Sequence, residues 1–248
     1  MNNYPLSVCR YSIQPGDNYW LLAQRFNISV YDIYAVNPYV DPNNLFIGQN
    51  IYIPMHTYVS HHLRPTKCIS PAEVELKSNM RKLWEEHVAW TRMTIMSLNF
   101  KSPDVDAVIA RLLQNATDMG DALRPFYGNQ IGDEFSALIK EHLVIAADLV
   151  KAAIAGDQQA ARAAEKKWYS NADEIAAFLS RINPYLCEEE VRKMFYSHLA
   201  LTKSEAVLMI NNNYKKSIEV YDEIQKQALG MADAITEGIV KQFPNVFG

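Results

Sequence analysis

Three histidines recur at nearly constant spacing in the C-terminal part of the chain, and each is followed 28 or 29 residues later by a carboxamide side chain. The three pairs are His87 with Asn115, His142 with Asn171, and His198 with Gln227. An imidazole beside a carboxamide can form a hydrogen bond, contact a small polar ligand or contribute to a metal site. These six side chains are therefore the first candidates for chemistry in this region.

The spacing of each pair predicts where its two members lie. The midpoints of the pairs fall at residue 101, at Gly156-Asp157 and within Asn211-Asn212-Asn213, and each midpoint has residues typical of turns. Residues equidistant from the turn of a helical hairpin lie at the same height, here ~20 Å from the turn at ~1.5 Å per residue. We predict that the three pairs form one polar layer across a bundle.

Three interpretations of this layer remain open. It can be a hydrogen-bonded layer that sets the helix register, a pocket for a small polar ligand, or a metal site formed by the three histidines. Asp118 and Glu174 lie nearly one helical turn beyond the asparagines and could join the layer. No Glu-x-x-His pair of the ferritin-like kind occurs. We therefore predict no cofactor, with a divalent metal in the bundle as the alternative.

Helical periodicity dominates the region that carries these pairs. We predict six helices, near residues 73–99, 103–126, 131–155, 157–182, 187–211 and 213–242. An internal repeat relates them, because Asn115-Ala116 and His142-Leu143 recur 56 residues later as Asn171-Ala172 and His198-Leu199. The repeat predicts three helical hairpins, with histidine on the first helix and carboxamide on the second.

The N-terminal residues predict a different and smaller unit. Val8–Ile13 has the alternation of a β-strand, and a Pro-Gly-Asp turn follows it. Asn18 and Ser29 stand where two short helices need N-caps, and Asn37-Pro38 ends the second helix. Ile51-Tyr52-Ile53-Pro54 predicts a closing strand. The order is strand, helix, helix, strand.

This unit resembles the LysM domain. The matching residues are Tyr11, Ile13, Gly16-Asp17, Trp20, Ala23, Phe26, Val30, Ile33, Asn37-Pro38, Leu45, Gly48-Gln49 and Ile51-Tyr52-Ile53-Pro54. The resemblance implies that the unit binds N-acetylglucosamine polymers, chiefly peptidoglycan and chitin, in a shallow groove between two loops. The groove residues that it implies are Gly16, Asp17, Asn18, Tyr19, Asn37, Pro38, Tyr39, Leu45 and Ile47.

Two points qualify this resemblance. Asn18-Tyr19 stands where LysM domains usually have Thr-Leu, and the larger Tyr19 changes either the groove or the packing. The alternative to glycan binding is a LysM scaffold used only for contacts with other proteins, since a fold does not by itself determine a function.

Composition narrows the classes of partner and compartment. A net charge of -4 and a pI near 5.9 argue against nucleic acid as the main partner. The chain has no run of about 18 apolar residues, so we expect no membrane span. Its N-terminus lacks the pattern of a signal peptide, which predicts synthesis in the cytoplasm. Three widely spaced cysteines indicate no disulfide framework.

The helical region resembles an uncharacterised family of bacterial all-helical proteins. The residues that carry this resemblance include Leu83-Trp84, Glu86-His87, Asn115, Gly120, Trp168, Asn171-Ala172-Asp173 and His198-Leu199 with Thr202. The family brings no established activity. We therefore predict a two-domain protein with an α+β LysM module at residues 1–55, a linker at 56–71 and an all-α bundle of six helices at 72–248.

The functional prediction is a non-enzymatic protein that binds peptidoglycan or a chitin-like glycan. Its LysM pattern without a signal peptide resembles modules on spore-coat and cortex proteins of endospore-forming bacteria. We accordingly expect association with the cell wall or the spore envelope, with spore or envelope proteins as further partners. The alternative is a LysM-tethered bundle that binds a metal or a small ligand, or that acts as an enzyme.

Overall fold

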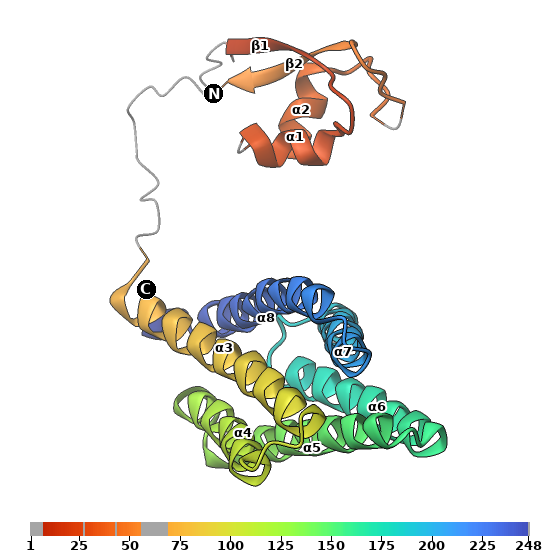
Figure 1. Ribbon diagram of the computed structural model, residues 1–248. Coiled ribbons are helices and arrows are strands. Elements are labelled where there is room, and N and C mark those ends of the chain that lie inside the picture. Colours follow the sequence, from red (N-terminus) through yellow and green to blue (C-terminus); the bar gives the residue numbers. More distant parts are fainter. Residues whose placement is uncertain (1–6, 27, 43, 56–68, 248) are drawn as a thin grey trace. The chain divides into compact units, whose positions relative to one another are not determined.

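The computed structural model describes residues 7–26, 28–42, 44–55 and 69–247 of the 248-residue chain. It contains two compact units, Met1–Lys67 and Cys68–Gly248, and each is described by itself (Figure 1). Most of the predicted linker lies outside the described residues. Its last two residues are Ser70, which caps the first helix of the second unit, and Pro71, which begins that helix.

The N-terminal unit has the predicted βααβ order. Its elements are β1 (Ser7–Ser12), α1 (Tyr19–Phe26), α2 (Val30–Val36) and β2 (Asn50–Met55). The two strands pair antiparallel, with Ser12 opposite Asn50. A small apolar core consists of Ile13, Tyr19, Leu22, Ala23, Ile33, Ile51 and Ile53. A sheet of two strands is only marginally stable by itself, so the two short helices that pack against it provide the rest of the core.

Helix caps explain how two such short helices form. The Asn18 Oδ1 atom accepts a hydrogen bond of 2.9 Å from the Leu21 amide at the start of α1. Ser29 and Asp32 form a reciprocal capping box at the start of α2. Caps of this kind satisfy amide groups that have no partner within the helix. Both were predicted from the sequence.

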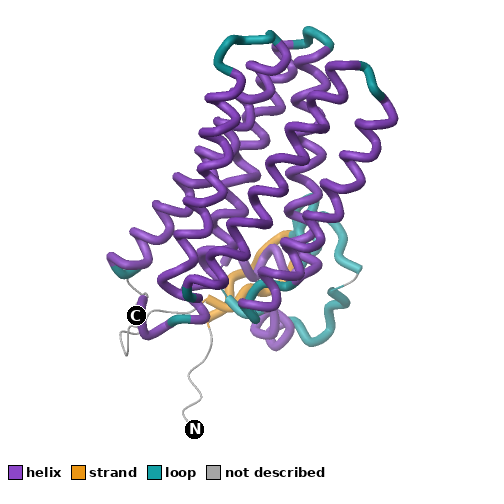
Figure 2. Tube along the Cα trace, turned by 90° about the horizontal axis from the view of Figure 1, so that it is seen from below, coloured by secondary structure: helices purple, strands orange, loops and turns teal. Residues whose placement is uncertain are grey.

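The C-terminal unit consists of six long helices and one short one, among the described residues. They are α3 (Pro71–Asn99), α4 (Val105–Tyr127), α5 (Asn129–Ala155), α6 (Gln158–Ile182), α7 (Glu188–Ile210), α8 (Tyr214–Gln242) and α9 (Pro244–Phe247). The long helices run side by side as adjacent hairpins (Figure 2). The six-helix prediction is confirmed, whereas the short α9 was not predicted.

The contacts between helices show which helices face the interior of the bundle. Each long helix packs against the next in the chain, and α8 packs back against α3. In addition, α3, α5 and α7 contact one another. These are the three helices that carry the histidines, so the first helix of every hairpin faces the interior.

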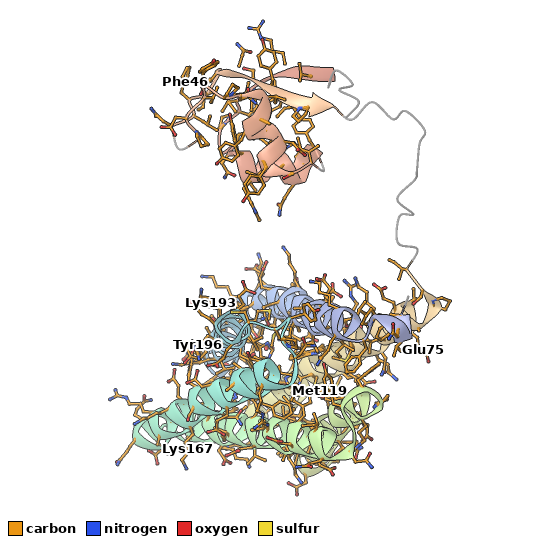
Figure 3. All side chains as sticks on the ribbon, turned by 180° about the vertical axis from the view of Figure 1, so that it is seen from behind. Phe46, Glu75, Met119, Lys167, Lys193 and Tyr196 are labelled. Atoms are coloured by element: carbon orange, nitrogen blue, oxygen red, sulfur yellow. The ribbon has the colours of Figure 1, made fainter. Side chains whose placement is uncertain are left out.

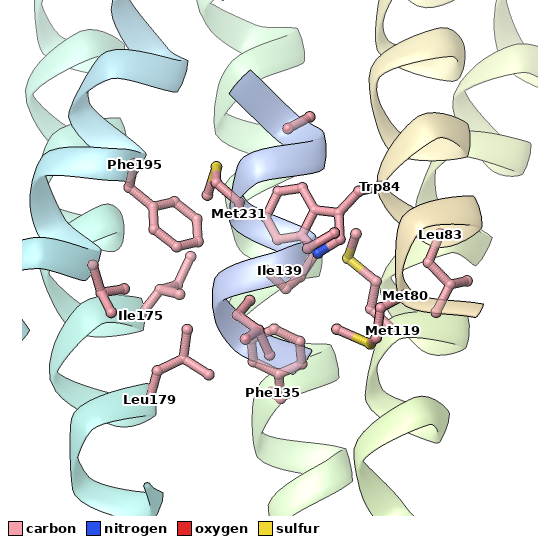
Figure 4. Close-up of a cluster of buried hydrophobic side chains, with 14 of the residues drawn as sticks. Met80, Leu83, Trp84, Met119, Phe135, Ile139, Ile175, Leu179, Phe195 and Met231 are labelled. Carbon is pink, nitrogen blue, oxygen red and sulfur yellow. The ribbon is translucent and has the colours of Figure 1, made fainter. Parts of the chain in front are cut away.

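Large apolar side chains fill much of this interior. Trp84, Ile139 and Phe195, one from each of these three helices, lie among them (Figure 4). Elsewhere α4 and α5 approach so closely that a Cβ atom on Gly120 would lie 2.5 Å from the Gly132 carbonyl oxygen. None of the described helices is long and apolar enough to cross a membrane.

Candidate functional site

Two glycine turns lie next to each other in the N-terminal unit. In the first, the Asp17 amide donates to the Gln14 carbonyl and Gly16 has φ +86°. In the second, the Gln49 amide donates to the Phe46 carbonyl and Gly48 has φ +85°. Positive φ at the third position of such a turn favours glycine.

The backbone of Ile13 joins the two turns. Its amide donates to the Gln49 carbonyl at 2.8 Å, and its carbonyl accepts from the Gly48 amide at 2.9 Å. The structure therefore brings together the two loops between which the LysM resemblance implies a groove. Gly16, Asn18 and Ile47 are exposed there.

Asp17 stabilises the first turn from inside. Its carboxylate accepts hydrogen bonds from the Tyr11 hydroxyl at 2.7 Å and from the Gln14 amide at 2.8 Å. It also forms an ion pair of 3.1 Å with Arg25. Burial raises the pKa of Asp17, but the bonds from Gln14 and Tyr11 and the charge of Arg25 outweigh burial, so that the pKa is lowered. The side chain is only 2% exposed, which leaves the carboxylate little access to a ligand.

Asn37 is also a structural residue. Its side-chain NH2 donates to the carbonyls of Ile33 and Tyr52, and its Oδ1 accepts from the Tyr52 amide at 2.7 Å. The carboxamide thus pairs with the edge of β2 as another strand would. The side chain of Asn37 is thus bonded within the unit, and its predicted contact with glycan stays a prediction.

Tyr19 is buried as well. Its side chain is buried in the core, and its ring meets that of Tyr34 edge to face at 5.2 Å. The Tyr19 hydroxyl is buried without a hydrogen-bond partner. The exchange of leucine for tyrosine therefore changes the packing of the unit. Sequence position alone could not decide between the groove and the core, because the first residue of a helix can face either.

The exposed members of the predicted groove lie mainly in the second loop. Tyr39 is 99% exposed and Ile47 is 68% exposed, whereas Leu45 is half-buried and packs against the core. Pro38 is exposed beside Tyr39. The prediction missed Phe46, which is 66% exposed on the surface of the unit (Figure 3). Its neighbour Ile47 is exposed as well, so alternation along Leu45-Phe46-Ile47 would not have identified Phe46.

In the helical unit, each histidine lies beside the carboxamide that the spacing assigns to it. The Nδ1 atoms of His87, His142 and His198 lie 3.2, 2.8 and 3.0 Å from the carboxamide oxygens of Asn115, Asn171 and Gln227, respectively. All three imidazoles are buried. The three pairs connect α3 with α4, α5 with α6 and α7 with α8, so each pair joins the two helices of one hairpin.

A second hydrogen bond repeats in all three pairs and identifies the tautomer. The carboxamide NH2 donates to the carbonyl four residues before the histidine, at Leu83, Leu138 and Met194. With its NH2 used in this way, the carboxamide presents oxygen to the imidazole, so Nδ1 carries the hydrogen and donates it. Protonation of Nε2 would then charge the ring, and the Nε2 atom of His142 is already occupied as an acceptor from the Trp168 indole.

The three pairs lie close to one another. The rings of His87 and His198 are 5.6 Å apart, and the Trp168 indole donates to His142 Nε2 at 3.1 Å. Burial lowers the pKa of His142 to about 3 and that of His198 to about 4. Burial likewise lowers the pKa of His87 well below its ordinary value, and the charges that His198 and His142 would carry lower it further. The layer is held in its uncharged form.

The two acidic residues do not join this layer. Asp118 accepts a hydrogen bond from Gln114 and lies 4.0 Å from Arg111, while Glu174 is exposed. In the part of the chain that the structure describes, no group of three His, Cys, Asp or Glu side chains is arranged to hold a metal ion. The geometry thus favours the hydrogen-bonded layer over the metal site.

The comparisons with known proteins concern the N-terminal unit. A family model for the LysM domain matches residues 11–54, so this part of the chain is a LysM domain. A LysM domain implies binding of peptidoglycan or chitin. Neither the curated proteins nor the solved structures include a match to the chain. The comparisons therefore give no support to the resemblance drawn for the helical region.

Proposed function

We propose that the protein is a non-catalytic binder of a glycan that contains N-acetylglucosamine, and that its LysM domain makes the contact. The carrying observation is the pair of glycine turns joined through Ile13, which brings together the two loops that carry exposed Asn18 and exposed Ile47. Apolar and aromatic surfaces suit the C–H faces and the acetyl methyl group of such a sugar, and free backbone groups suit its amide.

Within this proposal, Tyr39, Phe46 and Ile47 provide the apolar contacts. Exposed apolar residues that gather on a small unit commonly mark an interaction site. Asp17, Asn18 and Asn37 act on the glycan indirectly, because their side chains hold the two loops in place. This division assigns the second loop to binding and the first turn to support.

The histidines of the bundle support the non-catalytic part of the proposal. General acid–base catalysis at neutral pH favours groups whose pKa lies near 7 and which reach the substrate. His142 and His198 are buried, with pKa values lowered by burial to about 3 and about 4. We also propose that the glycan is that of a cell wall or spore envelope, on the strength of the LysM resemblance.

Sedimentation with insoluble peptidoglycan, and separately with chitin, tests the assignment. The full chain, residues 1–56 and residues 72–248 are each mixed with the glycan and centrifuged. We expect the full chain and residues 1–56 to sediment with it and residues 72–248 to stay in solution. Sedimentation of the helical part alone would reverse the assigned roles. Failure of all three with both glycans would leave the contact-scaffold alternative as the better account.

A further inference from the structure

The helical unit contains a cavity of about 380 Å³ lined by residues of α3, α4, α5, α6 and α7. A site of roughly 300–1,000 Å³ is typical for small ligands. By comparison, an engineered apolar cavity of roughly 150 Å³ is large enough to bind benzene. Protein interiors are otherwise closely packed, so an opening of this size requires an explanation in the sequence.

The repeat supplies that explanation. Three residues before each histidine the side chains are large, namely Trp84, Ile139 and Phe195, and they fill the interior (Figure 4). Four residues after each histidine they are small, namely Thr91, Ala146 and Thr202, and all three line the cavity. The cavity therefore begins one helical turn beyond the histidine layer, on the side of the hairpin turns.

The next turn of the same helices continues the cavity wall. Ile95, Val150 and Ala206, eight residues after the histidines, also line it. These three belong to a small apolar cluster that is separate from the main core of the bundle. The cavity thus separates two apolar clusters, and equivalent positions of the three repeats form its walls.

One hydroxyl in the wall lacks a partner. The Thr91 hydroxyl donates to the carbonyl of His87, four residues earlier, at 2.7 Å. Thr202 occupies the equivalent position after His198, but its buried Oγ1 atom has no hydrogen-bond partner. A buried hydroxyl without a partner is unfavourable, which indicates that the wall near Thr202 is incomplete as it stands.

The mouth of the cavity lies between α6 and α7 and differs from the walls. Its exposed residues are Gln158 and Arg162 from α6, Val207 from α7 and Asn211 directly after α7. Lys203 and Glu165 form an ion pair of 2.6 Å across it. With Arg162 added to this neutral pair, the mouth has a net positive charge, which favours an anionic group.

We propose that this cavity binds a small amphipathic carboxylate of the fatty-acid class, with its apolar chain inside and its carboxylate at Arg162 and Lys203. The apolar walls select the chain, and the positive mouth selects the sign of the head group. The site belongs to the helical unit alone, so it adds a second ligand to the proposed glycan and does not depend on it.

Titration of the full chain with dodecanoate, below its micelle concentration, tests the proposal directly. We expect saturable binding in calorimetry and a melting temperature of the helical unit that rises with ligand concentration. Ala206→Leu fills the cavity from α7 and should weaken binding by at least about tenfold, since overpacked sites do not accept further atoms. Ala163→Leu adds the same atoms at an exposed position of α6 that does not line the cavity, and should leave binding unchanged.

A second filling variant, Ala146→Leu on α5, keeps the test decisive if Ala206→Leu does not fold. No saturable binding of dodecanoate to the wild-type chain would overturn the proposal. Undiminished binding in both folded filling variants would also overturn it, because the ligand would then lie elsewhere. Sedimentation with glycan is measured on the same samples. Because the two assays are independent, a failure of dodecanoate binding is distinguishable from a failure of glycan binding.

The head group is tested by charge. Arg162→Gln should weaken dodecanoate binding roughly two- to fivefold, as expected for one exposed ionic contact. It should leave binding of uncharged 1-dodecanol unchanged. Lys166→Gln removes an equal charge from α6 away from the mouth and should affect neither probe. Equal loss of both probes in Arg162→Gln, or no loss of either, would overturn the assignment of a carboxylate at the mouth.

Discussion

The two units of this protein differ in the side chains that distinguish their surfaces and interiors. The LysM domain exposes large apolar residues, including Tyr31, Tyr39, Phe46 and Ile47. The helical unit instead buries polar ones, in particular its three histidines and their partners. A small unit has little interior, so its exposed apolar residues are available for contact with a ligand. In the bundle the polar groups are hidden, and their role there is to join helices.

The hydrogen bonds of the two units differ in the same sense. Asn18 and Ser29 bond to amides two or three residues away. The histidine pairs join residues 28 or 29 apart, and Arg81 bonds to Asp233, 152 residues away. The loss of one side chain should therefore have a local effect in the LysM domain and an effect on the whole bundle in the helical unit.

The largest effect is expected for His142→Leu. This change leaves both the Asn171 oxygen and the Trp168 indole N–H buried without a partner. At ~1–3 kcal/mol for each of these two groups, we expect the free energy of unfolding of the bundle to fall by about 2–6 kcal/mol. Denaturant unfolding of the full chain measures it, and Val144→Leu at an exposed position of α5 is the control. A loss below about 1 kcal/mol would contradict a stabilising layer.

Acid should destabilise the bundle next most strongly. A histidine with a lowered pKa in the folded state takes up its proton only on unfolding, so stability is lost as pH falls below 6.5 toward about 4. Burial raises the pKa of Glu205 to about 7, so this carboxyl binds its proton more tightly in the folded state and stabilises it as pH falls. One proton is thus taken up on folding by Glu205, whereas three are released on folding by the histidines. The net loss is roughly 3 kcal/mol per pH unit, at ~1.4 kcal/mol for each proton.

Unfolding of each unit at pH 7, 6 and 5 checks this expectation. The LysM domain serves as the internal comparison. The pKa of Asp17 is lowered in the folded domain, so the stability that this carboxylate contributes is lost only as pH falls below its ordinary pKa of 3.8. We expect the stability of the bundle to fall between pH 6.5 and 5 while that of the LysM domain stays constant. A constant stability of the bundle over this range would show that the histidines are not held neutral.

Asn18→Ala should have a smaller effect, confined to the LysM domain. It removes the cap of α1, which typically costs ~1 kcal/mol. We expect the melting temperature of the LysM domain to fall more than its affinity for glycan, with the bundle unaffected. Gln24→Ala, at an exposed position of the same helix, is the matched control. A loss of affinity at unchanged stability would instead place Asn18 in direct contact with the glycan.

The smallest effect on stability is expected for Tyr39→Ala. A side chain that is 99% exposed loses no packing, so the free energy of unfolding should change by less than about 0.5 kcal/mol. Sedimentation with glycan should nevertheless weaken. Tyr31→Ala removes another tyrosine that is 82% exposed, outside the two loops, and should leave sedimentation unchanged. Equal affinities of Tyr39→Ala and the wild type would remove Tyr39 from the site.

Local sequence signals predicted much of this architecture. The caps at Asn18 and Ser29 act within three residues, so they are readable without any knowledge of the fold. The histidine pairs act over a longer range, yet they too were predictable, because the turn position and the rise of a helix together determine which residues face each other. Periodicity and spacing thus determined the elements and their register.

Other features depended on how the elements pack in three dimensions. Tyr19 and Asn37 face the core, and Trp168 adds a bond to His142 that no spacing indicated. The cavity depends on the volumes of side chains from five helices together. Sequence alone determined which residues share a helix face and a height, because those follow from local geometry. Only the tertiary structure decided which faces are filled, because packing depends on neighbours that are distant in the chain.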